Sequence, residues 1–218
     1  KQALLETMTE RALLLQAAPE ARLVRYPHVH QNRVAFTYLG DIWTATTDGN
    51  DIRRLTVHTA RDAYPRFSPD GKWIAFSSNR FGNLDVFVVP AEGGQPTRLT
   101  WHSAADQVLG WTPDSTRVLF RAALEFDHRP IPRLYTVDLE GREPEALPPP
   151  RGAQGAFSAD GTKLLYNPKG NEEYYWKRYK GGQHPEIWLA DLKAKRYARL
   201  TDYVGKNAHP MWTATGKA

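Results

Sequence analysis

Short apolar runs alternate with polar turns along most of the chain, and one unit of this pattern recurs. Its landmark is a turn that follows an aromatic residue and that holds an Asp in three of four copies. The copies read Phe67-Ser68-Pro69-Asp70-Gly71, Trp111-Thr112-Pro113-Asp114-Ser115, Phe157-Ser158-Ala159-Asp160-Gly161 and Trp212-Thr213-Ala214-Thr215-Gly216. Pro presets the first corner, Asp hydrogen-bonds within its own turn and Gly accepts the left-handed corner. These positions are therefore predicted to be structural: Asp70, Gly71, Asp114, Asp160 and Gly161.

Three more segments of each unit have the apolar character of short strands. The turn is followed by a run such as Trp73-Ile74-Ala75-Phe76, and Arg33-Val34-Ala35-Phe36 fits the same place in an earlier unit. The next strand carries an aliphatic–aromatic pair: Ile42-Trp43, Val86-Phe87, Leu134-Tyr135 and Ile187-Trp188. The last strand reads Arg54-Leu55-Thr56, Arg98-Leu99-Thr100, Ala146-Leu147-Pro148 and Arg199-Leu200-Thr201.

The spacing of the copies identifies the architecture. Successive pairs and successive last strands are both 44, 48 and 53 residues apart. Four strands in a repeat of ~45 residues is the pattern of a β-propeller blade. We therefore predict an all-β fold, a propeller of four-stranded blades.

The repeat also predicts the domain organisation. The expected blades cover residues 26–63, 64–106, 107–154 and 155–207, and a fifth begins at 208–218, within one partial propeller over 23–218. Residues 1–22 lie outside the repeat and are spaced to suit a short helix that Pro19 ends. Because propellers close with ~4–8 blades, we expect the chain to be a piece of a larger propeller.

Composition narrows the classes of chemistry. The chain has 218 residues, of which 41% are hydrophobic, 24% charged and 11% aromatic, which is typical of a globular protein. It has no Cys, which excludes thiolate nucleophiles and Cys-ligated metal sites. No apolar run approaches the ~18 residues that a membrane span needs, so no membrane association is predicted.

The net charge of +5 is concentrated in one segment. Between positions 163 and 199 the chain has nine basic residues and four acidic ones, and the rest of the chain is balanced. A nucleic-acid domain usually spreads its basic residues along a face with interleaved aromatics. The cluster is therefore interpreted as a locally basic loop, and no nucleic-acid partner is predicted.

Few residues suggest catalysis. There is no Gly-x-Ser-x-Gly elbow to present a serine nucleophile, and Gly93-Gly94 and Gly181-Gly182 lack the Lys-Ser/Thr and the helix of a phosphate-binding loop. His28-x-His30 places two imidazoles on one strand face, as a metal pair or as two surface histidines, and Asp127-His128 is read as a solvated turn. We predict no catalytic residue, no metal and no cofactor.

The motifs resemble those of a known family. Phe67 to Phe76 resembles the propellers of TolB, the prolyl oligopeptidases and tricorn proteases. Tyr26 to Trp43 is similar to the opening blade of tricorn-type proteases, and Trp176-Lys177-Arg178-Tyr179-Lys180-Gly181-Gly182 before Ile187-Trp188 is similar to a stretch of that family's first propeller. The resemblance covers about residues 22–218.

The resemblance implies a fragment of the amino-terminal, six-bladed propeller of a tricorn-type serine protease. In that family a second propeller, a PDZ-like domain and a serine peptidase core follow, and the catalytic residues lie in that core. The implied role is to channel or filter peptides, with the remaining domains and further copies in a hexamer as partners. A cytoplasmic location is favoured over export, and whether this chain itself counts as an enzyme is left open.

One departure from the family bears on the substrate. The resemblance implies paired arginines, after the second Arg-Leu-Thr, that anchor the substrate carboxylate, but Trp101 to Asp106 contains none. A substitute set is Lys177, Arg178 and Lys180, against the alternative of a solvated basic loop. Two other functions stay open: a stand-alone TolB-type interaction scaffold and, more distantly, a propeller-fused amidohydrolase suggested by His28-x-His30.

Overall fold

The computed structural model describes residues 23–124, 131–170, 184–202 and 205–213. In this part of the chain there are sixteen strands and no helix. The first two sheets hold β1 (Arg25–His30), β2 (Arg33–Tyr38), β3 (Asp41–Thr46) and β4 (Arg53–Arg54), then β5 (Asp62–Phe67), β6 (Trp73–Ser78), β7 (Asp85–Pro90) and β8 (Thr97–Arg98). The other two hold β9 (Gln107–Trp111), β10 (Arg117–Ala122), β11 (Arg133–Asp138) and β12 (Glu145–Ala146), then β13 (Gln154–Phe157), β14 (Lys163–Asn167), β15 (Trp188–Asp191) and β16 (Arg196–Arg199).

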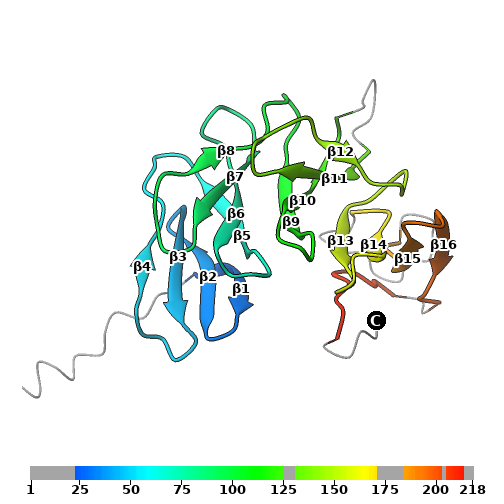
Figure 1. Cartoon of the computed structure of the whole chain (residues 1–218), viewed down its shortest axis with the longest axis horizontal. Helices are drawn as coiled ribbons and strands as arrows, with labels where there is room; N and C mark the ends of the chain where they lie inside the picture. Colours follow the sequence, from blue (N-terminus) through cyan, green and yellow to red (C-terminus); the bar gives the residue numbers. More distant parts are fainter. Residues whose placement is uncertain (1–22, 125–130, 171–183, 203–204, 214–218) are drawn as a thin grey trace, which may run out of the picture.

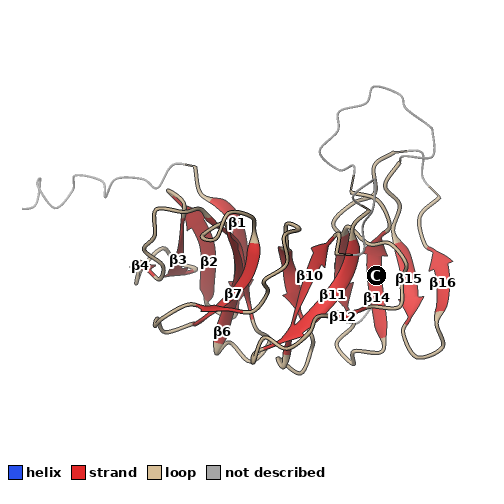
Figure 2. Ribbon diagram, turned by 90° about the horizontal axis from the view of Figure 1, so that it is seen from above, coloured by secondary structure: helices blue, strands red, loops and turns tan. Residues whose placement is uncertain are grey.

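Each sheet is antiparallel and its four strands pair in chain order. The four sheets follow one another along an arc in Figure 1, and Figure 2 shows their strands side by side with loops at both ends. The predicted all-β propeller of four-stranded blades is therefore confirmed. The short helix expected in residues 1–22 lies outside the described residues.

An aromatic pair stands at the same register position of every sheet. The partners across the second and third strands are Phe36 and Trp43, Phe76 and Phe87, Phe120 and Tyr135, and Tyr166 and Trp188. The ring centroids of Phe76 and Phe87 lie 5.7 Å apart, and so do those of Phe120 and Tyr135. Such cross-strand pairs stabilise a sheet beyond the area that they bury.

The core lies between neighbouring sheets, because successive residues of a strand point to opposite faces. In β7, Phe87 packs with Ile42 of the preceding sheet, whereas Val86 packs with Val118 and Phe120 of the following one. Leu134 of β11 likewise packs with the fourth sheet. The aliphatic–aromatic pairs thus join the second and third blades to both of their neighbours.

The turns between the first and second strands share one geometry in the second, third and fourth sheets. The Ser68 hydroxyl lies 2.6 Å from Asp70 Oδ1, which also accepts the Lys72 amide at 3.1 Å. Thr112 and Ser158 make the same contact with Asp114 and Asp160, each at 2.6 Å. The residue that follows the Asp has a positive φ, which is +73° for Gly71.

None of the described residues forms a helix with the length and apolar character that a membrane crossing requires.

Candidate functional site

The first strands of the four sheets form a concave wall. β1 contacts β5, β5 contacts β9 and β9 contacts β13, so these strands lie at the inner edge of the arc. A cavity of about 390 Å³ opens on this wall, lined by residues of all four strands and by the segment that follows the fourth sheet, including His28, Arg66, Gly110, Gly155 and Met211. The wall is the face that a molecule passing along the propeller axis would meet.

Arg66 holds two of the inner strands together. Its Nε donates to the carbonyl of Leu109 at 3.1 Å and its Nη1 to the carbonyl of Pro65 at 2.9 Å. Because two of its guanidinium nitrogens donate to backbone carbonyls, Arg66 stabilises the wall.

His28 and His30 lie between the first two blades. The Nδ1 of His28 accepts the amide of Phe67 at 3.1 Å, and the His30 ring lies 5.7 Å from the Phe67 ring. Burial, followed by the charge of Arg66 and by His30, lowers the pKa of His28 to about 4, so its imidazole is neutral at pH 7. His28 is therefore a half-buried hydrogen-bond acceptor that also lines the cavity on the wall. Among the described residues no group of three or more His, Asp or Glu side chains could hold a metal.

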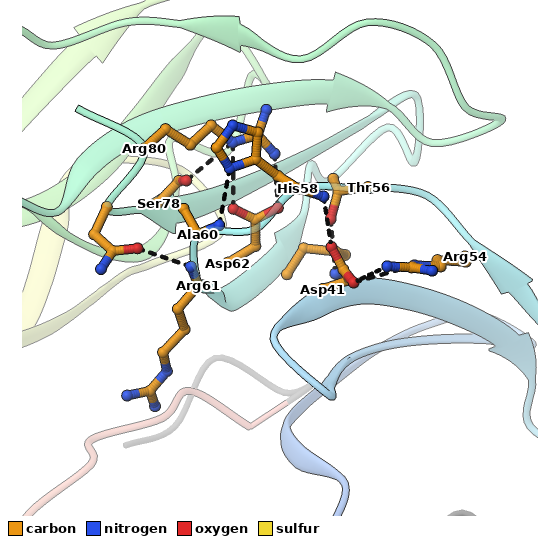
Figure 3. A network of polar contacts seen from close by, with 11 residues as sticks. Asp41, Arg54, Thr56, His58, Ala60, Arg61, Asp62, Ser78 and Arg80 are labelled. Carbon is orange, nitrogen blue, oxygen red and sulfur yellow. Dashed lines mark hydrogen bonds and ion pairs between the residues drawn. The ribbon is translucent and has the colours of Figure 1, made fainter. Parts of the chain in front are cut away.

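A polar network joins the first blade to the second at the end of the last strand (Figure 3). Arg54 Nη2 lies 2.5 Å from Asp41 Oδ2, and Thr56 Oγ1 accepts the amide of Ile42 at 2.9 Å. His58 Nδ1 accepts the amide of Ala60 at 2.9 Å. These contacts fold the link between the two blades back over the start of β3.

The same network ends on a buried ion pair. Arg80 Nη2 lies 2.7 Å from Asp62 Oδ2, and the two side chains are 13% and 0% exposed. The Arg80 guanidinium also lies over the rings of Phe76 and Phe87, at 5.7 and 5.2 Å from their centroids. The Asp62 carboxylate is thus buried with a cation that is itself seated on two aromatic rings.

The next junction repeats the network. Arg98 Nη2 lies 2.9 Å from Asp85 Oδ2, Thr100 Oγ1 accepts the amide of Val86 at 2.9 Å, and His102 Nδ1 accepts the amide of Ala104 at 3.0 Å. Residues 54–62 and 98–106 share the spacing Arg-Leu-Thr-x-His-x-Ala-x-Asp. The sequence interpretation stopped at Arg-Leu-Thr and missed the His, the Ala and the Asp, although the spacing was there to be read.

The two junctions differ in the residue that faces the last Asp of this spacing. Asp106 corresponds to Asp62: the Asp62 amide donates to Gly40 O at 2.7 Å and the Asp106 amide to Leu84 O at 2.7 Å. Leu124, however, follows β10 at the place where Arg80 follows β6, two residues after the strand ends. Asp106 is 0% exposed, and within the described residues neither of its carboxylate oxygens has a hydrogen-bond partner.

The pKa of Asp106 lies above its usual range, chiefly because the carboxyl is buried. Burial raises it to about 7; the Asp85 carboxylate also raises it, while Thr100 and Arg98 act in the opposite direction. Asp106 borders a cavity of about 510 Å³ between the second and third blades, which Leu99, Leu124 and Tyr135 also line. Further lining residues include Thr100, Trp101, His102, Gly141, Arg142 and Glu143.

The basic residues singled out from the sequence, Lys177, Arg178 and Lys180, lie outside the described residues, as do Asp127-His128 and Gly181-Gly182. The loop that follows Arg98-Leu99-Thr100 is described. Its Trp101 is 59% exposed and lies under the Arg98 guanidinium, 5.7 Å from the ring centroid.

Solved structures share the fold. The crystal structure of the tricorn protease matches with a TM-score of 0.72 and 22% identity, over 86% of this chain and 19% of that one. A TolB structure from Agrobacterium tumefaciens matches with a TM-score of 0.67 and 19% identity, over 85% of this chain and 64% of that one.

Sequence relatives narrow the fold to a family. Tricorn protease homolog 1 of Streptomyces coelicolor is 38% identical over 195 residues, which are 87% of this chain and 18% of the relative. A second tricorn protease homolog of the same organism is 35% identical over 200 residues, 17% of its length. This chain therefore spans less than a fifth of the length of these relatives. The family model described as the tricorn protease N-terminal β-propeller domain matches residues 21–217, and the chain belongs to this family.

Proposed function

We propose that this chain is the non-catalytic amino-terminal propeller of a tricorn-type serine protease, and that it channels or filters peptides on their way to a peptidase core elsewhere in the same protein. The observation that carries the proposal is the family match over residues 21–217, together with relatives more than five times as long as the matched region. The complete propeller is proposed to have six blades, and the protein to assemble into a hexamer in the cytoplasm.

The inner wall supplies the surface that this role needs. It exposes backbone groups and the neutral imidazole of His28 in place of a dense charge, which suits the passage of peptides with different side chains. Gly110 leaves room on this wall, because a β-carbon built on it meets no atom within 4 Å. A bulky side chain there would narrow the passage without disturbing the sheets.

The test uses Gly110→Trp in the full-length protein and a series of peptides of increasing length. We expect kcat/KM to fall for the longer peptides and to change little for the shortest, since only the longer ones fill the passage. Val57→Trp is the matched control, because Val57 is exposed and does not line the cavity on the wall. Equal kinetics for both variants at every length would contradict the channelling role.

Lys177, Arg178 and Lys180 are proposed to bind the carboxylate of short peptides. They are the basic residues of the family-like segment, and an Arg fork binds a carboxylate through two hydrogen bonds. Replacing all three by Gln should raise KM for short peptides and leave the KM of amidated peptides unchanged. An unchanged KM for both kinds of peptide would contradict this role and support the alternative that the three residues belong to a solvated basic loop.

A stand-alone TolB-type scaffold is the second candidate function, favoured by the likeness to TolB over 64% of that chain. The two functions are distinguished by the complete reading frame. A serine peptidase core encoded downstream supports the protease, and a stop codon soon after the sixth blade supports the scaffold.

A further inference from the structure

One position of the repeat carries a charged side chain in a single unit. It is the position immediately before the aromatic residue of the repeat turn, and successive units hold Arg66, Gly110, Ala156 and Met211 there. All four residues line the cavity of about 390 Å³ on the concave wall. Because Gly, Ala and Met occupy the place in the other units, the blade does not require an arginine, and the presence of Arg66 needs a separate explanation.

The Arg66 guanidinium keeps one nitrogen unused. Its Nε and Nη1 donate to the carbonyls of Leu109 and Pro65, whereas its Nη2 makes no hydrogen bond to any described residue. Burial lowers the pKa of Arg66, and no carboxylate of the described residues acts on it. Since a guanidinium stays protonated in proteins, Arg66 is a half-buried cation that has no acidic partner within the described part of the chain.

His28 adds a second donor to the same cavity. Its Nδ1 accepts the Phe67 amide at 3.1 Å and its imidazole is neutral at pH 7, so the ring hydrogen is on Nε2. Among the described residues this N–H has no hydrogen-bond partner. Arg66 directly precedes Phe67, and its charge reaches the His28 imidazole. The wall therefore offers a cation and a neutral N–H donor to one space.

From these two unused donors we propose that the cavity on the wall binds a carboxylate group of a peptide, with Arg66 Nη2 as its cationic partner and His28 Nε2 as a second donor. Hydrogen bonds between a guanidinium and a carboxylate are charge-assisted and roughly twice as strong as neutral ones. Gly110 follows the residue whose carbonyl Arg66 binds, and a β-carbon built on it meets no atom within 4 Å, so space is left beside the guanidinium. That the ligand is a peptide rests on the proposed channelling role, whereas the carboxylate chemistry comes from the cavity itself.

Other occupants fit this lining less well. A cation would meet the Arg66 guanidinium, and none of the described residues that line the cavity is an Asp or a Glu that could offset the repulsion. A purely apolar group would remove water from two N–H donors without giving them an acceptor, which is unfavourable. The cavity has the size of a small-molecule site, ~300–1,000 Å³, and Met211, which is 78% exposed, connects it to solvent.

Calorimetry on the purified full-length protein tests the proposal with two pairs of small probes. N-acetylalanine carries a terminal carboxylate and is compared with N-acetylalanine amide. N-acetylglutamate amide carries a side-chain carboxylate and is compared with N-acetylglutamine amide. Concentrations reach about 10 mM, since a single ion pair is expected to give a Kd near the millimolar range.

We expect the charged probe of at least one pair to bind about 10-fold more tightly than its neutral counterpart at pH 7, because only the charged probe pairs with the guanidinium. A preference in the first pair assigns the site to the carboxyl terminus of a peptide, and a preference in the second pair assigns it to acidic side chains. No preference in either pair would overturn the proposal.

Two variants place the carboxylate in the cavity. Arg66→Gln removes the cation, and Gly110→Asp keeps Arg66 but adds a carboxylate to the wall beside it, so both should remove the preference for the charged probe. Gly110→Asp gives the answer even if Arg66→Gln loses stability with its bonds to Leu109 and Pro65. Gly110→Asn is the matched control, because it adds nearly the same volume without the charge and should keep the preference.

Two results with these variants would also overturn the proposal. A preference that survives both Arg66→Gln and Gly110→Asp would show that the carboxylate binds elsewhere in the protein. An equal loss in Gly110→Asp and Gly110→Asn would show that the charge of the wall does not decide binding.

The outcome is separable from that of the channelling test. If Gly110→Trp slows the hydrolysis of longer peptides while neither probe pair shows a preference, channelling stands and the carboxylate site is wrong. If a preference is found while Gly110→Trp has no effect that depends on peptide length, the carboxylate site stands and channelling is wrong.

Discussion

The indole nitrogen of Trp212 donates a hydrogen bond to the backbone carbonyl of Ala156, with 2.9 Å between the two atoms. Trp111 makes the same bond to the carbonyl of Arg66, also at 2.9 Å. Arg66 and Ala156 each precede the aromatic residue of a repeat turn, Phe67 and Phe157. The segment that follows the fourth sheet therefore docks on β13 as the third blade docks on the second, which supports the start of a fifth blade there.

This bond predicts a measurable loss on removing one N–H. Trp212→Phe keeps an aromatic ring and leaves the Ala156 carbonyl without its donor, so the full-length protein should lose about 1 kcal/mol of unfolding free energy. Trp111→Phe should cost a similar amount, because its bond is the same. Urea unfolding followed by circular dichroism measures both, and a loss confined to Trp111→Phe would argue against the docking of a fifth blade.

The Arg80–Asp62 pair predicts a larger effect. Arg80→Met leaves the Asp62 carboxylate, at 0% exposure, without its cation, which should cost about 3–5 kcal/mol. The double variant Asp62→Asn/Arg80→Met should recover most of this loss, because the uncompensated charge is gone. Arg53→Met is the matched control: its partner Asp51 is exposed, so it should change stability far less. Similar losses for Arg80→Met and Arg53→Met would contradict the role assigned to burial.

His28 predicts how stability depends on pH. Its pKa is lowered from 6.5 to about 4 in the folded protein, so the unfolded chain binds the proton more tightly and acid favours unfolding. The contribution of the neutral imidazole to the free energy of unfolding is complete above pH 6.5. It is lost as the pH falls toward 4, by at most about 3 kcal/mol. His28→Asn keeps a side-chain acceptor for the Phe67 amide but cannot titrate. The midpoint temperature of thermal unfolding should therefore fall more steeply between pH 7 and pH 4 for the unmodified protein than for the variant. Parallel midpoint profiles of the two proteins would exclude this role.

Much of the fold was predictable because a blade repeats its strands at a regular spacing. The offset between Val86 and Leu134 equals that between Leu99 and Leu147, so independent strands agree on one repeat. The faces of each strand follow from the period of two, as Val86 and Phe87 show by packing against different blades.

The inter-blade cavity was not predictable in the same way. Whether Asp106 is paired depends on the side chain two residues beyond another strand, and Arg80 and Leu124 stand far from their carboxylates in sequence. His28 illustrates the same limit, since its environment comes from Phe67 and Arg66 of the next blade. Only the packing of one blade on another brings these groups together.

Labelling of the full-length protein with a serine-reactive fluorophosphonate, followed by mapping of the modified residue, tests the account's central claim most directly. The account predicts one labelled serine outside these 218 residues and loss of peptide hydrolysis in step with labelling, because Ser68, Ser77 and Ser158 are held in structural hydrogen bonds. A protein that neither reacts with the probe nor hydrolyses peptides, or one that is labelled within this chain, would contradict it.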